Sequence, residues 1–200
     1  MSSTLLTSDE FVHAWGSDGL IGLPEQTIAA PIPEDARMFL VKAGLPRHIT
    51  FAHKSLPSEM SFVRLSDGLQ NVIAEQTVGP AFPSGWSVYW IMGKESFDNG
   101  SAWFCIHQDS GHVVRMDIEL DNPISLVNTS VAHLATAILL SCSWSQESAR
   151  QGQWSAMVDQ LGDSLRRSDP GALRSKDTFW NGILDDMRNV GPGGFLVLRQ

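Results

Sequence analysis

The residues from Trp86 to Leu140 constrain the fold of this chain more than any other part of its sequence. They contain strand-like segments at Trp86–Met92, Ala102–Gln108 and His112–Leu120, and then a helix-like segment at Ser130–Leu140. The tripeptide at 109–111 (Asp-Ser-Gly) combines short polar side chains with a glycine, as tight reversals do. The stretch therefore predicts an antiparallel hairpin that leads into a helix.

The third of these strands predicts a sheet with one buried face and one solvated face. Apolar and charged residues alternate along it. The apolar set is Val114, Met116, Ile118 and Leu120, and the charged set is Arg115, Asp117, Glu119 and Asp121. A strand places such alternating sets on opposite faces, and this pattern is typical of antiparallel sheets.

Helices are expected before this stretch. Thr7 and Glu10 have the spacing of a capping box at the start of a first helix. A second helix follows Pro33 and stops at residues 43–46 (Ala-Gly-Leu-Pro), where Gly44 is free to adopt a left-handed conformation.

Other elements are expected from shorter signals. Strands are predicted at Ile49–His53, Ser61–Leu65 and Asn71–Glu75, and a polar turn at Lys94–Gly100. After Ser130–Leu140 the pattern stays helical to about residue 190, with breaks at Gly152 and at residues 168–171.

These elements predict a single α+β domain that spans residues 1–200. Its centre is a mainly antiparallel sheet of about six strands flanked by helices, and residues 129–190 form a C-terminal helical elaboration. Hydrophobic residues make up 42% of the chain and charged residues 18%, which is typical of a globular protein.

The formal net charge of −8 restricts the class of partner. Phosphate binding needs a concentrated positive field, so direct nucleic-acid binding is not expected. A negative protein attracts a basic protein partner. The first residues lack the pattern of a signal peptide, and no apolar run is long enough to span a bilayer, so a cytoplasmic location without membrane contact is expected.

Three side chains around the hairpin raise the question of a metal site. Cys105, His107 and His112 lie close in sequence, and Cys105 and His107 share one strand face. A zinc site needs three or four ligands in a closed geometry, and no fourth ligand is apparent nearby. These residues are therefore interpreted as structural, and neither a metal site nor a cofactor is predicted.

Candidate partner contacts lie on the charged strand face. Asp117, Glu119 and Asp121 are interpreted as a solvated face, with recognition of a basic partner as the functional alternative. Trp103 is one of seven tryptophans and is a candidate interface anchor, because aromatic residues dominate interface energetics.

No catalytic residue is predicted. The sequence has no G-x-S-x-G elbow, and Lys94 lacks the glycine and hydroxyl neighbours of a phosphate-binding loop. Serine is abundant, however, so composition leaves a serine hydrolase open, as well as a small metal-dependent enzyme that uses His107, His112 and nearby acids.

The order of several short motifs resembles one family. Residues 39–46 (Phe-Leu-Val-Lys-Ala-Gly-Leu-Pro), 91–93 (Ile-Met-Gly), 105–113 (Cys-Ile-His-Gln-Asp-Ser-Gly-His-Val) and 127–131 (Val-Asn-Thr-Ser-Val) resemble the motifs of the fourth subgroup of bacterial SUKH-superfamily immunity proteins, and Trp180 matches in kind. The resemblance covers about Trp15 to Asp186. His107 departs from the acidic residue common at its position, and Val131 from the usual leucine.

The resemblance implies a non-enzymatic, cofactor-free α+β scaffold. Such proteins bind and neutralise a cognate toxin, often a nuclease or a nucleic-acid deaminase, in the producing cell. Toxin-contact residues vary within such families, so the resemblance assigns none here. A general regulatory or scaffold module of the same fold, with no toxin, stays as a further alternative.

Overall fold

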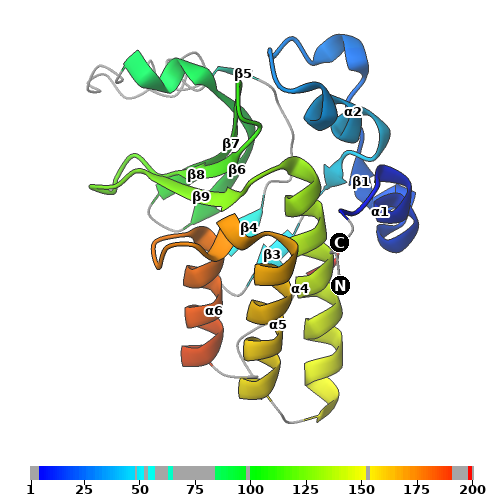
Figure 1. Cartoon of the computed structure of the whole chain (residues 1–200), viewed down its shortest axis with the longest axis vertical. Coiled ribbons are helices and arrows are strands. Elements are labelled where there is room, and N and C mark those ends of the chain that lie inside the picture. The colour runs from blue at the N-terminus through cyan, green and yellow to red at the C-terminus, as the bar shows by residue number, and fades with distance from the viewer. Residues whose placement is uncertain are drawn as a thin grey trace.

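Five antiparallel strands form the largest sheet of the computed structural model, which describes residues 5–47, 49–51, 54–56, 63–64, 84–97, 100–151, 154–190 and 198–199. The strands follow one another in chain order (Figure 1). They are β5 (Val63–Arg64), β6 (Tyr89–Phe97), β7 (Gly100–His107), β8 (Val113–Met116) and β9 (Ile124–Asn128). Two smaller antiparallel sheets pair β1 (Leu20–Ile21) with β2 (Leu45–Pro46), and β3 (Ile49–Phe51) with both β4 (Lys54–Leu56) and β10 (Leu198–Arg199).

Three helices lie side by side below this sheet in Figure 1. They are α4 (Val131–Gln151), α5 (Trp154–Ser168) and α6 (Phe179–Val190), and the 3-10 turn η4 (Pro170–Leu173) connects the last two. The N-terminal helices α1 (Ser8–Trp15) and α2 (Glu34–Lys42) contact α4 from its other side. Short 3-10 turns are η1 (Ser17–Gly19), η2 (Glu25–Thr27) and η3 (Ser84–Val88).

One continuous hydrophobic core joins the helices to one face of the sheet. Phe104 of β7 meets Phe179 of α6 edge-on, with ring centroids 5.5 Å apart. Ile106 and Val127 from the sheet and Trp180 from α6 are completely buried in the same cluster. The C-terminal helices therefore pack on the sheet and share its core.

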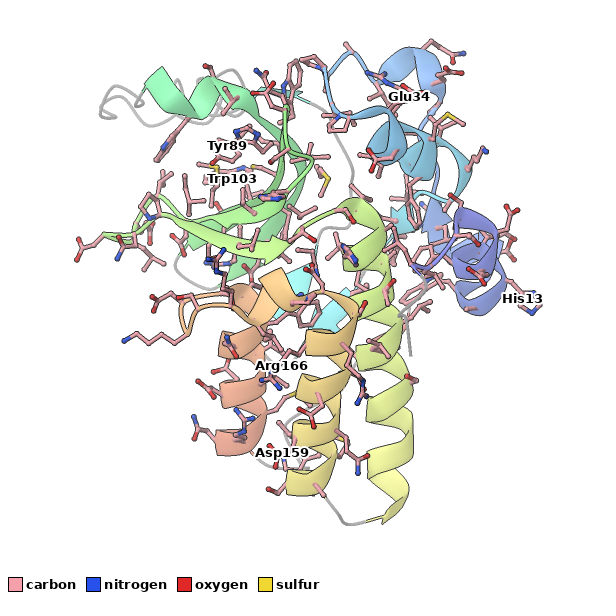
Figure 2. All side chains as sticks on the ribbon, in the orientation of Figure 1. His13, Glu34, Tyr89, Trp103, Asp159 and Arg166 are labelled. Carbon is pink, nitrogen blue, oxygen red and sulfur yellow. The ribbon has the colours of Figure 1, made fainter. Side chains whose placement is uncertain are left out.

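The opposite face of the sheet is buried too, which corrects the prediction of a solvated face. A second cluster consists of Ile91, Trp103, Cys105, Val114 and Met116. Tyr89 packs against it, and Figure 2 shows Tyr89 and Trp103 together above the sheet. The sheet is therefore buried on both faces at β7 and β8.

The strand predicted at His112–Leu120 ends early, at Met116. The Asp117 N–H donates to the carbonyl of Pro123 at 2.8 Å, and the chain then turns back into β9, a strand that the sequence did not predict. Ile118 and Leu120 are exposed rather than buried. The alternation of residue types continued past the end of the strand, so it could not mark the turn.

The segment predicted as a strand at Trp86–Met92 also has different bounds. Trp86 lies in η3, and β6 begins at Tyr89 and runs through Phe97, across most of the turn predicted at Lys94–Gly100. A short apolar run does not distinguish a strand from a helical turn. The polar end of β6 can stay in the sheet because Glu95 is neutralised there by Arg115 of β8.

Several local predictions are confirmed. β7 matches the predicted Ala102–Gln108 strand, and the hairpin turns with Gly111 at φ +69°. The capping box of Thr7 and Glu10 forms at the start of α1. Gly44 has φ +70°, and a Cβ there would come within 2.0 Å of the Ile21 carbonyl oxygen, so the chain can make this turn only with glycine.

Other predicted elements lie partly or wholly outside the residues that the structure describes. The helix predicted at Ser130–Leu140 is longer, since α4 runs to Gln151, and Gly152 lies outside the described part of the chain. The strands predicted at Ile49–His53 and Ser61–Leu65 are described in part, as β3 and β5. The strand predicted at Asn71–Glu75 falls wholly outside the described residues.

The fold is α+β and single-domain, as predicted, with a smaller sheet than expected. Among the described residues its largest sheet has five strands rather than about six, and β5 contributes only two residues. The helical elaboration assigned to residues 129–190 and the bounds 1–200 stay predictions. Within the same described part of the chain, none of the helices is long and apolar enough to cross a bilayer.

Candidate functional site

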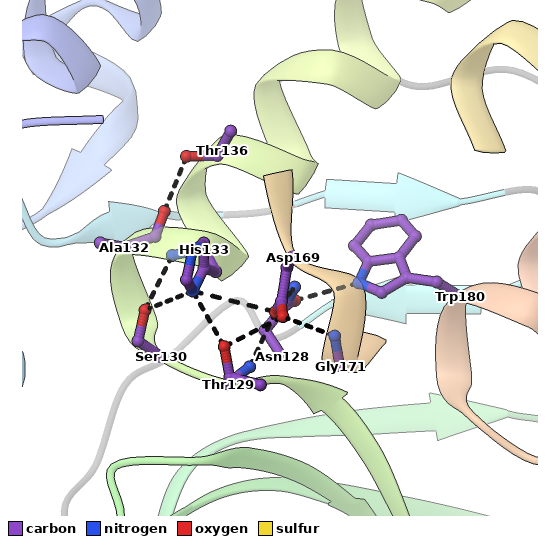
Figure 3. A network of polar contacts seen from close by, with 9 residues as sticks. All are labelled: Asn128, Thr129, Ser130, Ala132, His133, Thr136, Asp169, Gly171 and Trp180. Carbon is purple, nitrogen blue, oxygen red and sulfur yellow. Dashed lines mark hydrogen bonds and ion pairs between the residues drawn. The ribbon is translucent and has the colours of Figure 1, made fainter. Parts of the chain in front are cut away.

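A buried polar network lies where β9 passes into α4. Its hub is the carboxylate of Asp169, between α5 and η4, which is buried together with Asn128. Asp169 accepts hydrogen bonds from Asn128 Nδ2 at 3.0 Å, from the Thr129 N–H at 2.8 Å, from Thr129 Oγ1 at 3.0 Å and from the Gly171 N–H at 3.2 Å (Figure 3). Both carboxylate oxygens therefore have partners, as a buried charge requires.

The network extends to α6 through Asn128. Trp180 donates its indole N–H to Asn128 Oδ1 at 3.0 Å, and both side chains are completely buried. The amide of Asn128 thus accepts from α6 and donates to the Asp169 carboxylate. These bonds fix the positions of β9, η4 and α6 relative to one another.

A histidine, a serine and an aspartate meet at this network, but their geometry differs from that of a hydrolase triad. His133 Nδ1 lies 3.0 Å from Ser130 Oγ and 3.9 Å from Asp169 Oδ2. A triad needs one ring nitrogen facing the serine and the other facing the carboxylate. Here both partners face the same nitrogen, so the carboxylate cannot orient the ring toward the serine.

Ser130 already has a structural role. Its carbonyl accepts the Leu134 N–H at 3.0 Å, and its Oγ accepts the His133 N–H at 3.1 Å. Ser130 is therefore the N-cap of α4, where serine is among the preferred residues.

The trio considered for a metal is not assembled as a site. Cys105 is completely buried, and burial raises the pKa of its thiol, so the thiol stays protonated. His107 accepts the backbone N–H groups of Asp109 and Ser110 at Nδ1, both at 3.3 Å, while His112 is exposed. Across the described residues, no group of three or more His, Cys, Asp or Glu side chains is placed to hold a metal ion.

His107 also contacts Tyr89. The two rings meet edge-on with centroids 5.1 Å apart. Burial, and secondarily the nearby Cys105, raise the pKa of the Tyr89 hydroxyl above its ordinary value of 10.0. The phenol is therefore neutral at physiological pH and is a poor candidate for a general base.

The three predicted acidic contacts separate into two environments. Asp117 is buried, and its Oδ2 accepts from Arg115 Nη2 at 3.2 Å. Arg115 also donates from Nε to Glu95 at 2.6 Å. Glu119 and Asp121 lie in the turn after β8 and are exposed. Asp117 thus acts inside the fold, and only the other two carboxylates reach solvent.

The fourth predicted contact, Trp103, lies in the second core cluster and is 5% exposed. Three apolar residues after β8 are exposed and were not predicted as contacts: Ile118, Leu120 and Ile124. The spacing of Ile118 and Leu120 fits a buried strand face, so no sequence signal distinguishes these two from core residues, and Ile124 lies outside the strand that the sequence predicts.

Comparison with known families identifies a family for this chain. A family model described as SUKH-4 immunity protein matches residues 6–186. Comparisons with curated proteins and with solved structures gave no significant match.

Proposed function

Because the chain belongs to the SUKH-4 immunity protein family, we propose that it binds one cognate toxin and neutralises it without catalysis of its own. The match extends over residues 6–186 of 200, so it involves the sheet and the helical layer alike. The toxin would be blocked by occlusion of its active site or of its substrate surface.

One observation carries this proposal beyond family membership. The residues that resemble the family motifs serve the scaffold: Gly44 turns against Ile21, Asn128 bonds Trp180, and Ser130 caps α4. None of these contacts orients a nucleophile or a general base. Motif positions used in this way support a binding scaffold, whose specificity lies in other surface residues.

The charge of the chain supports a basic partner. A net charge of −8 speeds the association of a positively charged protein. Toxins that act on nucleic acids need basic surfaces to bind phosphates. A nuclease or a nucleic-acid deaminase is therefore the class of toxin that we propose, and the protein acts on it in the cytoplasm of the producing cell.

The geometry argues against the serine-hydrolase alternative, because Ser130 and Asp169 face the same nitrogen of His133. A metal-dependent enzyme is tested by elemental analysis of the purified protein, where stoichiometric zinc or iron would support it. A toxin-free regulatory module is tested by the neighbouring genes, since an immunity gene should lie beside a toxin gene.

Co-expression tests the proposal. The proposal predicts that a toxin domain is encoded beside this gene, and that domain is expressed in a sensitive host, with this protein or with an unrelated acidic protein of similar charge. We expect growth only with this protein. Equal killing in both cultures, with this protein present in folded form, would contradict the proposal.

A further inference from the structure

The turn between β8 and β9, residues 117–123, and the first residue of β9, Ile124, carry most of the exposed large apolar side chains among the described residues. Ile118 is 41% exposed, Leu120 53% and Ile124 37%. Among the described residues only two other large apolar side chains, Leu5 and Met38, are comparably exposed. The turn projects from the sheet at the left of Figure 1, away from α1 and α2.

A surface cavity of about 480 Å³ lies beside Leu120 and Ile124. One wall is the turn itself, with Leu120, Pro123 and Ile124. Phe179, at the start of α6, belongs to the opposite side. A cavity of this kind accepts an apolar side chain from a partner, which is how the central residues of protein interfaces bind.

The buried ion cluster holds this turn in one conformation. Arg115 fixes the Asp117 carboxylate, whose Oδ1 accepts the Glu119 N–H at 3.2 Å. The Asp117 carbonyl accepts the Leu120 N–H at 3.3 Å, and its N–H donates to Pro123. A turn ordered before binding loses less conformational entropy when a partner docks.

The charges around the cavity indicate which kind of partner surface it fits. Glu119 and Asp121 are exposed on the turn, and residues 117–124 include no basic residue. Of the other charged residues that line the cavity, Arg115 is already paired with Glu95 and Asp117, and Lys176 and Asp177 balance each other in formal charge. The rim is therefore acidic and complements a surface that carries lysine or arginine beside an apolar side chain.

We infer that the β8–β9 turn is the toxin-binding surface: an apolar side chain of the toxin enters the cavity beside Leu120 and Ile124, while basic groups of the toxin pair with Glu119 and Asp121. This inference rests on the proposed function. It differs from the sequence prediction, since Asp117 orders the turn from inside the fold and Trp103 takes no part.

Binding of the toxin domain encoded beside this gene, in a catalytically inactive form, tests the inference. We expect Leu120→Asp and Ile124→Asp each to raise Kd by about tenfold or more through faster dissociation. Met38→Asp in α2 is the matched control, since Met38 is 36% exposed at a different cavity. Its Kd should equal that of the wild type.

The contribution of Glu119 and Asp121 is measured separately, through the rate of association. Glu119→Lys and Asp121→Lys should slow association at low salt, and added salt should remove the difference. Glu25→Lys, in η2, reverses an exposed acid elsewhere and should act less strongly. Thermal melting of every variant checks that these surface changes leave the fold intact.

The outcomes separate the two proposals. If the wild type does not bind the toxin, the proposed function fails. If it binds and the turn variants bind equally well, only this surface is wrong, and a loss confined to Met38→Asp would move the interface to α2. A wild-type dimer that Leu120→Asp dissociates, with unchanged toxin binding, would instead assign the turn to a second copy of the chain and overturn the inference.

Discussion

Trp180 donates its indole N–H to Asn128 Oδ1 at 3.0 Å across 52 positions of sequence, and both residues are completely buried. The bond connects the strand before α4 to the helix that closes the core. Because Asn128 also donates to Asp169, loss of its side chain would remove the acceptor of the Trp180 indole N–H and one of the two donors to Asp169 Oδ2.

Asn128→Ala should therefore destabilise the fold strongly. We expect a loss of about 2–3 kcal/mol in the free energy of unfolding, measured by urea denaturation, because a buried indole N–H loses its acceptor and a buried carboxylate loses one of its donors. Asn189→Ala, at an exposed position in α6, is the control and should change stability by less than about 0.5 kcal/mol. Similar small losses for both variants would show that the network contributes little.

Arg115→Met should destabilise the fold by about 3–5 kcal/mol, since it leaves two buried carboxylates, Glu95 and Asp117, uncompensated. Arg166→Ala is the matched control. Arg166 forms an exposed ion pair with Asp163 at 2.9 Å, and such pairs contribute about 0–1 kcal/mol. Chemical denaturation of both variants measures the difference, and equal losses would contradict the account of the ion cluster.

The capping box of α1 predicts that the stability of the fold depends on pH through the carboxyl group of Glu10. The Thr7 backbone N–H, and then its hydroxyl, donate to Glu10 and lower the pKa of that carboxyl below its ordinary value of 4.5. A lowered folded-state pKa contributes stability above the unfolded pKa, and this stability is lost as pH falls through the folded value. Carboxyl NMR titration should place Glu10 below 4.5 in the wild type and closer to 4.5 in Thr7→Ala. An unchanged Glu10 titration in Thr7→Ala would contradict the contribution of the Thr7 hydroxyl.

Ser130→Ala tests whether Ser130 is a structural helix cap or a catalytic nucleophile. Loss of the cap should cost about 1 kcal/mol in the free energy of unfolding, and toxin neutralisation should persist. Hydrolysis of an activated ester by the wild-type protein that disappears in Ser130→Ala would restore the hydrolase alternative.

The features that sequence predicted correctly depend on neighbours in the chain. The Thr7 cap, the Gly111 reversal and the Gly44 turn each involve contacts or backbone conformations set within a few residues. The family motif around Asn128 was recognised as well. Its physical role was hidden, because its partners Asp169 and Trp180 lie 41 and 52 positions away.

The proposed binding surface follows from the sequence only in part, for a related reason. Strict alternation from Val114 to Asp121 satisfies a strand, yet the chain turns at Asp117, which pairs with Arg115 inside the fold. The sequence predicts Glu119 and Asp121 as candidate contacts, and both are exposed, whereas it predicts Leu120 on the buried face, and Leu120 is exposed as well. Only the course of the chain after Met116 shows which of these side chains reach solvent.

Titration of the inactive toxin domain encoded beside this gene with the purified protein, followed by calorimetry, tests the central claim most directly. We predict a one-to-one complex with a nanomolar or lower Kd, since a toxin must be held at low cellular concentration. The active toxin should lose its activity at the same stoichiometry. Absence of a complex at micromolar concentrations, with both proteins folded, would contradict the account.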